Sequence, residues 1–270
     1  QSSGRAGYRS CRSGADVKQM VDGWIILDKP LGLGSTQGVA AVKRNLRQAG
    51  FGKVKVGHGG TLDPLATGVL PIGIGEATKL CGRMLDASKV YAFTVAFGAE
   101  TDTLDLEGKV VVQSAVRPPL DAIESALGAF RGPIDQVPPA YSALMIDGER
   151  AYDRARAGEI VEMKSRAVTI LALTLDSTEG NPSALESATF TAHVSKRTYI
   201  RSMARDIARA SGTVGHVTML RRLRAGPPAG PPAGGLRRRH RRAAGGSGGA
   251  VFQRAPGGGA LRRGAGERGG

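Results

Sequence analysis

The alternation of apolar and polar residues divides the chain into a folded centre and two polar ends. Between residues 20 and 223, short runs rich in β-branched residues alternate with segments in which apolar residues recur every three or four positions. The short runs predict β-strands. They cover residues 21–27, 89–98, 109–113, 168–175 and 188–194. We expect the first of them to be a fully buried strand.

Three segments have the spacing of amphipathic helices. The first begins at Ser35, a residue type that caps helix N-termini, and its inner face carries Val39, Val42 and Leu46. The second covers residues 119–130. The third covers residues 199–210 and, on its outer face, presents a stripe of arginines: Arg201, Arg205 and Arg209. Because strands and helices follow one another without regular βαβ alternation, the order favours an α+β fold.

The two ends differ in composition from this centre. We interpret residues 1–19, which are polar and basic without periodicity, as a flexible leader before a domain at 20–223. Residues 224–270 consist mainly of Gly, Ala, Pro and Arg, so we expect a disordered tail. Residues 221–270 hold 12 Arg and one Glu and thus carry +11 of the net charge of +15. Two explanations stay open: a GC-rich gene read out of frame, or an arginine-rich RNA-binding arm.

Composition also excludes several classes of protein. No apolar run approaches the roughly 18 residues that a membrane-spanning helix needs, so we expect no membrane association. The two cysteines, Cys11 and Cys81, cannot build a disulfide framework or, alone, a thiolate zinc site. The histidines never stand at metal-ligand spacing, so no metal is expected. A reducing, cytoplasmic compartment fits this cysteine usage.

The clearest candidate chemistry lies in residues 55–79. This segment places one carboxylate, Asp63, among several glycines and directly before Pro64. Glycine allows a ligand to approach the backbone closely, and the proline restricts Asp63 to extended conformations. Such a loop presents a carboxylate as a nucleophile or base, although an isolated Asp-Pro is also typical of an ordinary turn. Neither a phosphate loop nor a serine-hydrolase elbow is present in the sequence.

Residues 55–79, KVGHGGTLDPLATGVLPIGIGEATK, resemble the signature motif of the TruB family of bacterial tRNA pseudouridine synthases. Further segments resemble the family in the family's own order: 23–30, 86–98, 101–108, 138–143, 195–201 and 215–223. The resemblance implies an α+β pseudouridine synthase fold. In that fold a central mixed, mainly antiparallel sheet is flanked by helices and carries an RNA-gripping insertion, here at about 131–158.

The resemblance also implies a reaction, the isomerisation of uridine to pseudouridine at position 55 in the T-loop of tRNA. The family needs no metal and no small-molecule cofactor for it. Asp63 matches the aspartate that attacks a flipped-out nucleoside, and Arg201 matches the arginine that pairs with it. Tyr91 matches a tyrosine that stacks on the target base. Tyr199 and Leu220 match other residues of the uridine pocket.

Further matches concern support and RNA binding. His58 matches a histidine that helps to hold the flipped-out nucleoside, while Lys29 and Pro30 match a support behind the catalytic loop. We expect two groups of basic residues to contact phosphates: Lys43, Arg44 and Arg47 in the first helix, and Arg150, Arg154 and Arg156 in the insertion. The expected partner is tRNA, bound by a monomer.

The chain departs from the family pattern at three places. Gly59 stands where the family usually has Thr. Arg197 replaces the usual glycine of SKGTYIR, and if that position needs a positive φ, arginine costs on the order of 1 kcal/mol. The tail stands where bacterial members carry a C-terminal RNA-binding domain. Two alternatives remain open: a non-catalytic tRNA-binding or RNA-folding protein with the same basic cleft, and a synthase that acts on another RNA.

Overall fold

The computed structural model describes residues 21–226 except 143, 147, 160 and 161. The predicted leader and the tail beyond residue 226 lie outside the described residues. The strands are β1 (Gly23–Lys29), β2 (Val56–His58), β3 (Ala66–Ile74), β4 (Lys89–Phe97), β5 (Ala99–Thr101), β6 (Val110–Gln113), β7 (Gly132–Gln136), β8 (Met145–Ile146), β9 (Glu149–Arg150), β10 (Arg166–Asn181), β11 (Ala184–Val194) and β12 (Gly215–Ala225). The helices are α1 (Ser35–Gln48), α2 (Cys81–Asp86), α3 (Leu120–Leu127), α4 (Ala151–Arg156) and α5 (Ile200–Ala210), with 3-10 turns η1 (Gly75–Leu80) and η2 (Gly128–Phe130).

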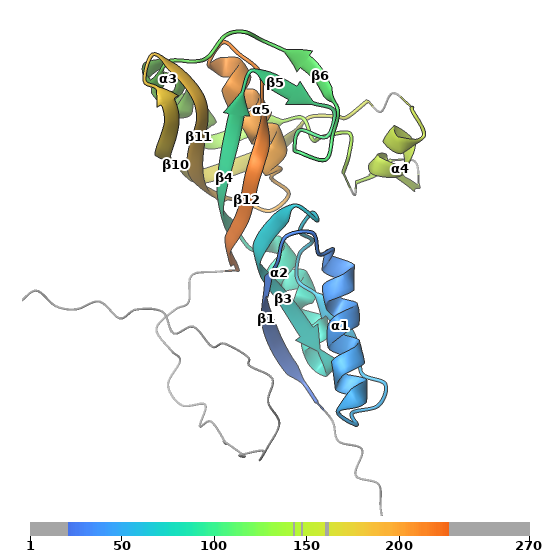
Figure 1. The fold of residues 1–270 in the computed structure, drawn as a ribbon. Coiled ribbons are helices and arrows are strands. Elements are labelled where there is room, and N and C mark those ends of the chain that lie inside the picture. The colour runs from blue at the N-terminus through green and yellow to red at the C-terminus, as the bar shows by residue number, and fades with distance from the viewer. Residues whose placement is uncertain (1–20, 143, 147, 160–161, 227–270) are drawn as a thin grey trace, which may run out of the picture. The chain divides into compact units, whose positions relative to one another are not determined.

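One eight-stranded sheet carries the fold (Figure 1). Its strands lie in the order β1-β3-β12-β4-β11-β10-β7, and β2 pairs with one end of β3. Every neighbouring pair is antiparallel except β12 with β3. This arrangement confirms the prediction of an α+β fold with a central mixed, mainly antiparallel sheet.

Helices cover two parts of this sheet. Helix α5 contacts β4 and β12, α3 contacts α5 and β10, and α1 contacts β1 and β2. The buried apolar side chains accordingly form two clusters, a large one around Phe93, Phe190 and Met203 and a smaller one around Leu70 and Ile72. The partly buried side chains of Tyr91 and Leu220 pack against both clusters, so these two candidate site residues lie where the clusters meet.

Strand β1 is not the buried strand that its apolar run predicts. Among the described strands it pairs only with β3, which makes it an edge strand of the sheet. Trp24, Ile25 and Ile26 are 37%, 38% and 61% exposed. A continuous apolar run indicates burial on both faces only when elements cover both faces. Here α1 covers one part of the strand, and the prediction of full burial was wrong.

The boundaries of two predicted regions shift. The predicted insertion begins as β7, which pairs with β10 in the main sheet, and only then leaves the sheet for β8, β9 and α4. Strand β12 runs to Ala225, two residues beyond the predicted end of the domain at residue 223. No helix in the described part of the chain is long and apolar enough to cross a membrane.

Candidate active site

Asp63 lies in the loop between β2 and β3, just before β3 begins. Ser35, the first residue of α1, fixes the preceding residue from behind: its hydroxyl donates to the Leu62 carbonyl at 2.9 Å and accepts from the Leu62 amide at 2.8 Å. Its sequence position predicted that Ser35 caps α1, but the N-cap residue is Gly34. The buried Ser35 hydroxyl instead connects the helix to the loop that presents Asp63.

Lys29 supports the same loop from the end of β1. Its side chain is fully buried, and its ammonium group donates to the carbonyls of Pro30, Leu33 and Pro64 at 3.1, 2.6 and 3.1 Å. Burial lowers the pKa of Lys29, and the negative charge of Asp63 opposes that shift. Pro30 is exposed and contributes its carbonyl to this contact. Because Pro64 follows Asp63 directly, these bonds fix the backbone of the candidate carboxylate.

Arg201 meets Asp63 from the first turn of α5. Its Nη2 lies 3.0 Å from Asp63 Oδ2, and its Nη1 lies 3.4 Å from Asp105 Oδ2. The same guanidinium donates to the carbonyls of Thr103 and Tyr141 at 2.7 and 3.0 Å. The Arg201 side chain is only 7% exposed, whereas that of Asp63 is 43% exposed. Arg201 is thus a buried partner of the carboxylate and not a member of a solvated arginine stripe.

Asp105 is a residue of this site that we did not predict. It lies in the turn between β5 and β6 and forms an isolated bridge with Val217 of β12. Its carboxylate accepts from the Thr103 hydroxyl at 2.6 Å and from the Glu107 amide at 3.0 Å. The segment 101–108 resembled the family as a motif, but only the folded turn shows that Asp105 reaches Arg201.

Arg222 on β12 is a second residue that we did not predict. It is 1% exposed and donates to three carbonyls: those of Val69, Thr61 and Gly60 at 2.8, 3.2 and 3.0 Å. Two of these carbonyls belong to the loop that presents Asp63. Arg222 lies within the motif 215–223, so its segment was noted, but spacing alone does not distinguish it from the exposed Arg221 beside it.

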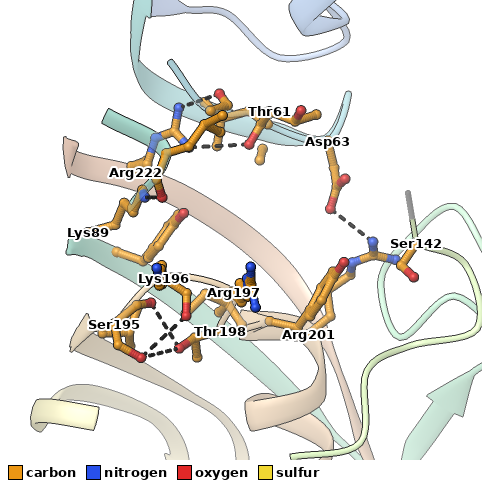
Figure 2. A pocket seen from close by; sticks show the side chains of 18 of the residues that line it. Thr61, Asp63, Lys89, Ser142, Ser195, Lys196, Arg197, Thr198, Arg201 and Arg222 are labelled. Carbon is orange, nitrogen blue, oxygen red and sulfur yellow. Dashed lines mark hydrogen bonds and ion pairs between the residues drawn. The ribbon is translucent and has the colours of Figure 1, made fainter. Parts of the chain in front are cut away.

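These groups line one cleft of about 510 Å³, shown in Figure 2. Thr61, Asp63 and Arg222 lie on its upper side in that view, and the chain from Ser195 to Arg201 lies on its lower side. Five of the expected site residues line this cleft: Asp63, Tyr91, Tyr199, Arg201 and Leu220. Asp63 lies in its loop, Tyr91 on β4 and Leu220 on β12. Tyr199 directly precedes α5, and Arg201 lies in it. The fold thus brings together residues that are far apart in sequence.

Tyr199 is held on two sides. The Gln136 side chain accepts from the Tyr199 amide at 2.8 Å and donates to the Tyr199 carbonyl at 3.1 Å. The guanidinium of Arg166 lies 4.8 Å from the centroid of the Tyr199 ring, within the range of a cation–π contact. Gln136 and Arg166 are further residues that sequence patterns did not single out.

His58 is placed differently from the other candidates. It lies on β2, paired with Ile72, and its Nδ1 is 3.4 Å from the Gly60 amide, which donates to it. Burial lowers the pKa of His58, and the nearby charge of Arg222 lowers it further. Among the described residues, His58, Lys29 and Pro30 are not part of the cleft lining; they stand behind the loop that carries Asp63.

The cleft has an excess of positive charge. Its lining contains two carboxylates, Asp63 and Asp86, against six cations: Lys89, Arg166, Lys196, Arg197, Arg201 and Arg222. The field is strong enough to act on Lys89, whose pKa is lowered to about 8 by burial and by the charge of Arg222. A cleft of this charge favours an anionic ligand. Within the described residues, no group of three or more His, Cys, Asp or Glu could hold a metal ion.

The family model and the most similar relatives that we compared indicate the same family. The family model of the TruB family pseudouridylate synthase (N terminal domain) matches residues 44–200. A protein of Novosphingobium aromaticivorans named tRNA pseudouridine synthase B is 80% identical over 208 residues, which are 77% of this chain and 68% of that protein. The protein of the same name from Zymomonas mobilis is 62% identical over 205 residues, 76% of this chain and 66% of that one. The matched segment thus spans about two thirds of these relatives.

A solved structure agrees with the sequence comparisons. A chain of the "Crystal Structure of a Cbf5-Nop10-Gar1 Complex" is 29% identical, with a TM-score of 0.55, over 75% of this chain and 48% of that one. The family match covers more than half of this chain and includes the loop of Asp63, and the ion pair of Asp63 with Arg201 joins two of the motifs on which the resemblance rests. The chain belongs to the TruB family of pseudouridylate synthases.

Proposed function

We propose that this protein converts uridine to pseudouridine at position 55 in the T-loop of tRNA. The observation that carries the proposal is the ion pair between Asp63 and the buried Arg201, 3.0 Å apart in a cleft that Tyr91, Tyr199 and Leu220 also line. The names of the relatives point to tRNA, and the cationic cleft lining suits a polyanionic substrate.

In this proposal Asp63 is the nucleophile. A carboxylate that forms a covalent bond with the nucleoside divides one difficult bond exchange into two easier steps. Arg201 fixes the direction of the carboxylate, because its guanidinium is itself held by Asp105 and by two backbone carbonyls. After cleavage of the glycosidic N1–C1′ bond the uracil rotates, C5 bonds to C1′ of the ribose, and the bond to Asp63 breaks, which regenerates the carboxylate. C5 loses a proton and N1 gains one, so the product is an isomer of the substrate.

The target base must leave the stacked T-loop to reach Asp63. The cleft volume of about 510 Å³ falls within the range of about 300–1,000 Å³ that is usual for small-ligand sites. We propose that Tyr91 stacks on the extruded base and that Tyr199 and Leu220 complete the pocket wall. Tyr91 and Leu220 pack against both core clusters, and Tyr199 is hydrogen-bonded to Gln136. These contacts favour the proposed roles, because side chains that are already fixed can orient the base without first becoming ordered.

The remaining candidates act from behind the loop. Lys29 donates three bonds to carbonyls, one of them that of Pro64, and these bonds favour a role for Lys29, with Pro30, as a support of the catalytic loop. His58 would reach the nucleoside after a change in the loop around Gly60, to which it is hydrogen-bonded. We further propose that the protein acts as a cytoplasmic monomer without a cofactor.

The test is an incubation of the protein with unmodified tRNA, followed by chemical mapping of pseudouridine. We expect wild-type protein to modify one T-loop uridine and Asp63→Asn to form no product while it still binds tRNA. Arg201→Met should lose activity with its fold retained. Asp121→Asn, at the exposed start of α3, is the matched control and should remain active.

The outcomes separate the alternatives. Tight tRNA binding by the wild type without any isomer would support a tRNA-binding or RNA-folding protein. Pseudouridine in another RNA, with none in tRNA, would support a synthase that acts on that other RNA. Turnover of Asp63→Asn within tenfold of wild type would remove Asp63 from the role of nucleophile.

A further inference from the structure

The turn from Ser195 to Thr198 joins β11 to α5 and forms part of the cleft wall. Both of its ends are tied down. The Ser195 amide donates to the Thr169 carbonyl at 2.8 Å, and the Ser195 hydroxyl accepts from the Thr169 amide at 2.9 Å. The Thr198 hydroxyl donates to the Ser195 carbonyl at 3.0 Å. This network fixes the backbone between them, as Figure 2 shows for the Ser195–Thr198 bonds.

In this turn, Arg197 has an energetically unfavourable backbone conformation. Its φ is +67°, in the left-handed region, where a side chain with a Cβ is strained and glycine is not. Only one other described non-glycine residue, Leu104, has a positive φ. Strained residues of this kind persist where the surrounding structure determines them and are concentrated at functional sites. The strained backbone at Arg197 therefore indicates a function for its side chain.

That side chain lies at the cleft, where its charge acts on the nearby carboxylate of Asp86. Arg197 is exposed and belongs to the cleft lining. In the described part of the chain, its guanidinium makes no hydrogen bond or ion pair. Its neighbour Lys196 differs, because the Lys196 ammonium group lies 2.9 Å from Asp86 Oδ1. Asp86 is thus in direct contact with Lys196, and it interacts with Arg197 only through the longer-range attraction of their charges.

The other cations of the cleft already have internal contacts. Arg222 and Lys89 donate to backbone carbonyls, Arg201 pairs with carboxylates, and Arg166 lies over the Tyr199 ring. Nε and Nη2 of Arg166 also have no hydrogen-bond partner, but both atoms are buried. Arg197 differs because it is exposed, so its guanidinium can meet an external anion without giving up a described hydrogen bond or ion pair. A guanidinium presents a planar fork of donors that matches the oxygens of a phosphate.

We propose that Arg197 is a phosphate-binding residue at the cleft, and that it contacts a backbone phosphate of the RNA beside the nucleotide that enters the cleft. This inference rests on the proposed function, since it takes RNA as the ligand of the same site. The contact is electrostatic and independent of base identity. It compensates for the strained backbone that an arginine requires at this position.

The first experiment separates charge from strain with three variants of the full-length protein. Arg197→Lys keeps the charge, whereas Arg197→Gly and Arg197→Asn remove it and tolerate a positive φ. We measure the affinity for a T-arm stem-loop RNA as a function of salt. Each lost phosphate contact should lower the slope of log affinity against log salt by about 0.7–0.9. We expect this loss in the Gly and Asn variants and not in the Lys variant.

Melting temperatures control for the fold. Because Gly and Asn relieve the strained backbone, both variants should melt at or above the temperature of the wild type. An unchanged salt slope in Arg197→Gly and Arg197→Asn would overturn the proposal. An equal loss in Arg197→Lys would overturn it as well, since the effect would then not follow the charge.

The second experiment locates the phosphate. Single phosphates of the stem-loop on either side of the target uridine are replaced by neutral methylphosphonates. At one position the replacement should weaken binding to the wild type about five- to tenfold and leave Arg197→Gly unaffected, as expected for a coupled pair in a double-mutant cycle. Equal losses in both proteins at every position would overturn the contact. A wild type that binds with this coupling but forms no pseudouridine would refute the proposed function alone.

Discussion

At the scale of single residues, the site depends on one arginine between two different carboxylates. Asp105 is nearly buried, with a 9% exposed side chain, whereas that of Asp63 is 43% exposed. Asp105 and the carbonyls of Thr103 and Tyr141 hold the guanidinium of Arg201 before any ligand is present. Asp63 therefore faces a partner whose direction is already fixed, which reduces the reorganisation that a reaction at Asp63 would need.

The glycines and the proline around Asp63 marked it as a candidate carboxylate, but only the resemblance of the motifs predicted that Arg201 pairs with it. Helical spacing alone placed Arg201 with Arg205 and Arg209 on a charged stripe. In the structure, Arg209 pairs with the buried Glu100, and Arg205 donates to the Val137 carbonyl. Periodicity identifies the face of a helix, but the residues that cover that face come from distant segments: Asp63, for example, precedes Arg201 by 138 positions. The burial of Arg201 therefore could not be read from α5 itself.

Lys89 leads to a prediction about pH. Its pKa in the folded protein is about 8, against an ordinary value of 10.5. Between these values the unfolded chain holds a proton that the folded protein has released, so the free energy of unfolding should rise as pH increases from 8 to 10.5. The contribution is at most about 3 kcal/mol. Denaturant unfolding at pH 7.5, 8.5 and 9.5 should show this rise in the wild type and a smaller one in Lys89→Met. Parallel profiles of the two proteins would contradict the prediction.

At the scale of secondary-structure elements, β3 shows where sequence patterns fail. Its segment contains Gly68, Pro71 and Gly73, residue types that are rare in central strands. The structure explains Pro71 and Gly68 locally. Strand β12 pairs with β3 at Ala66–Gly68, and β2 pairs with it at Ile72–Ile74, so Pro71 lies between the two partners. Gly68 has a φ of +99°, and a Cβ there would lie 2.2 Å from the Arg222 carbonyl oxygen.

Elements that do not depend on distant partners were predicted well. Helices α1, α3 and α5 begin and end close to the predicted positions, and the inner faces of α1 and α5 carry the expected apolar residues. Strands β4, β6, β10 and β11 also occur in the predicted segments. Strands β2, β3, β7 and β12 were not predicted, and β1, predicted as buried, is an exposed edge strand. The environment of such strands is set by pairing and coverage as well as by their own sequence.

The contact of β12 with the Asp63 loop gives a second prediction. Replacing Arg222 by Met would leave the carbonyls of Gly60, Thr61 and Val69 without their donors. We expect the free energy of unfolding to fall by about 2–4 kcal/mol and pseudouridine formation to fall with it, because the loop before Asp63 loses its anchor. Arg221→Met is the matched control. Arg221 is half-exposed and pairs with Asp28, so its loss should change stability by less than about 1 kcal/mol.

Thermal and denaturant unfolding of both variants would measure this difference. Equal stability of Arg222→Met and Arg221→Met would show that the three carbonyl contacts contribute little. A stable Arg222→Met protein with full activity would remove Arg222 from the support of the loop altogether.

At the scale of the whole molecule, the family assignment and the cleft concern residues 21–226, while much of the charge lies elsewhere. Residues 227–270 carry nine Arg and one Glu. Within the described part of the chain, the residues that line the cleft extend from Gly60 to Arg222. The reaction and the long-range attraction for RNA can therefore be separated by a truncation, and the two explanations of the tail predict different results.

We expect a chain that ends at Gly226 to keep the turnover of the full chain at saturating tRNA, because it retains Asp63, Arg201 and the cleft. Its affinity should fall by a similar factor for tRNA and for a stem-loop of scrambled sequence, since nine arginines attract any RNA at low salt. The slope of log affinity against log salt should become shallower for both RNAs. A dedicated RNA-binding arm would instead make the truncated chain lose affinity for the T-loop far more than for the scrambled stem-loop. Measuring both affinities at 50 and 200 mM salt, with turnover as the third readout, decides between an arm that recognises tRNA and a tail that only adds charge.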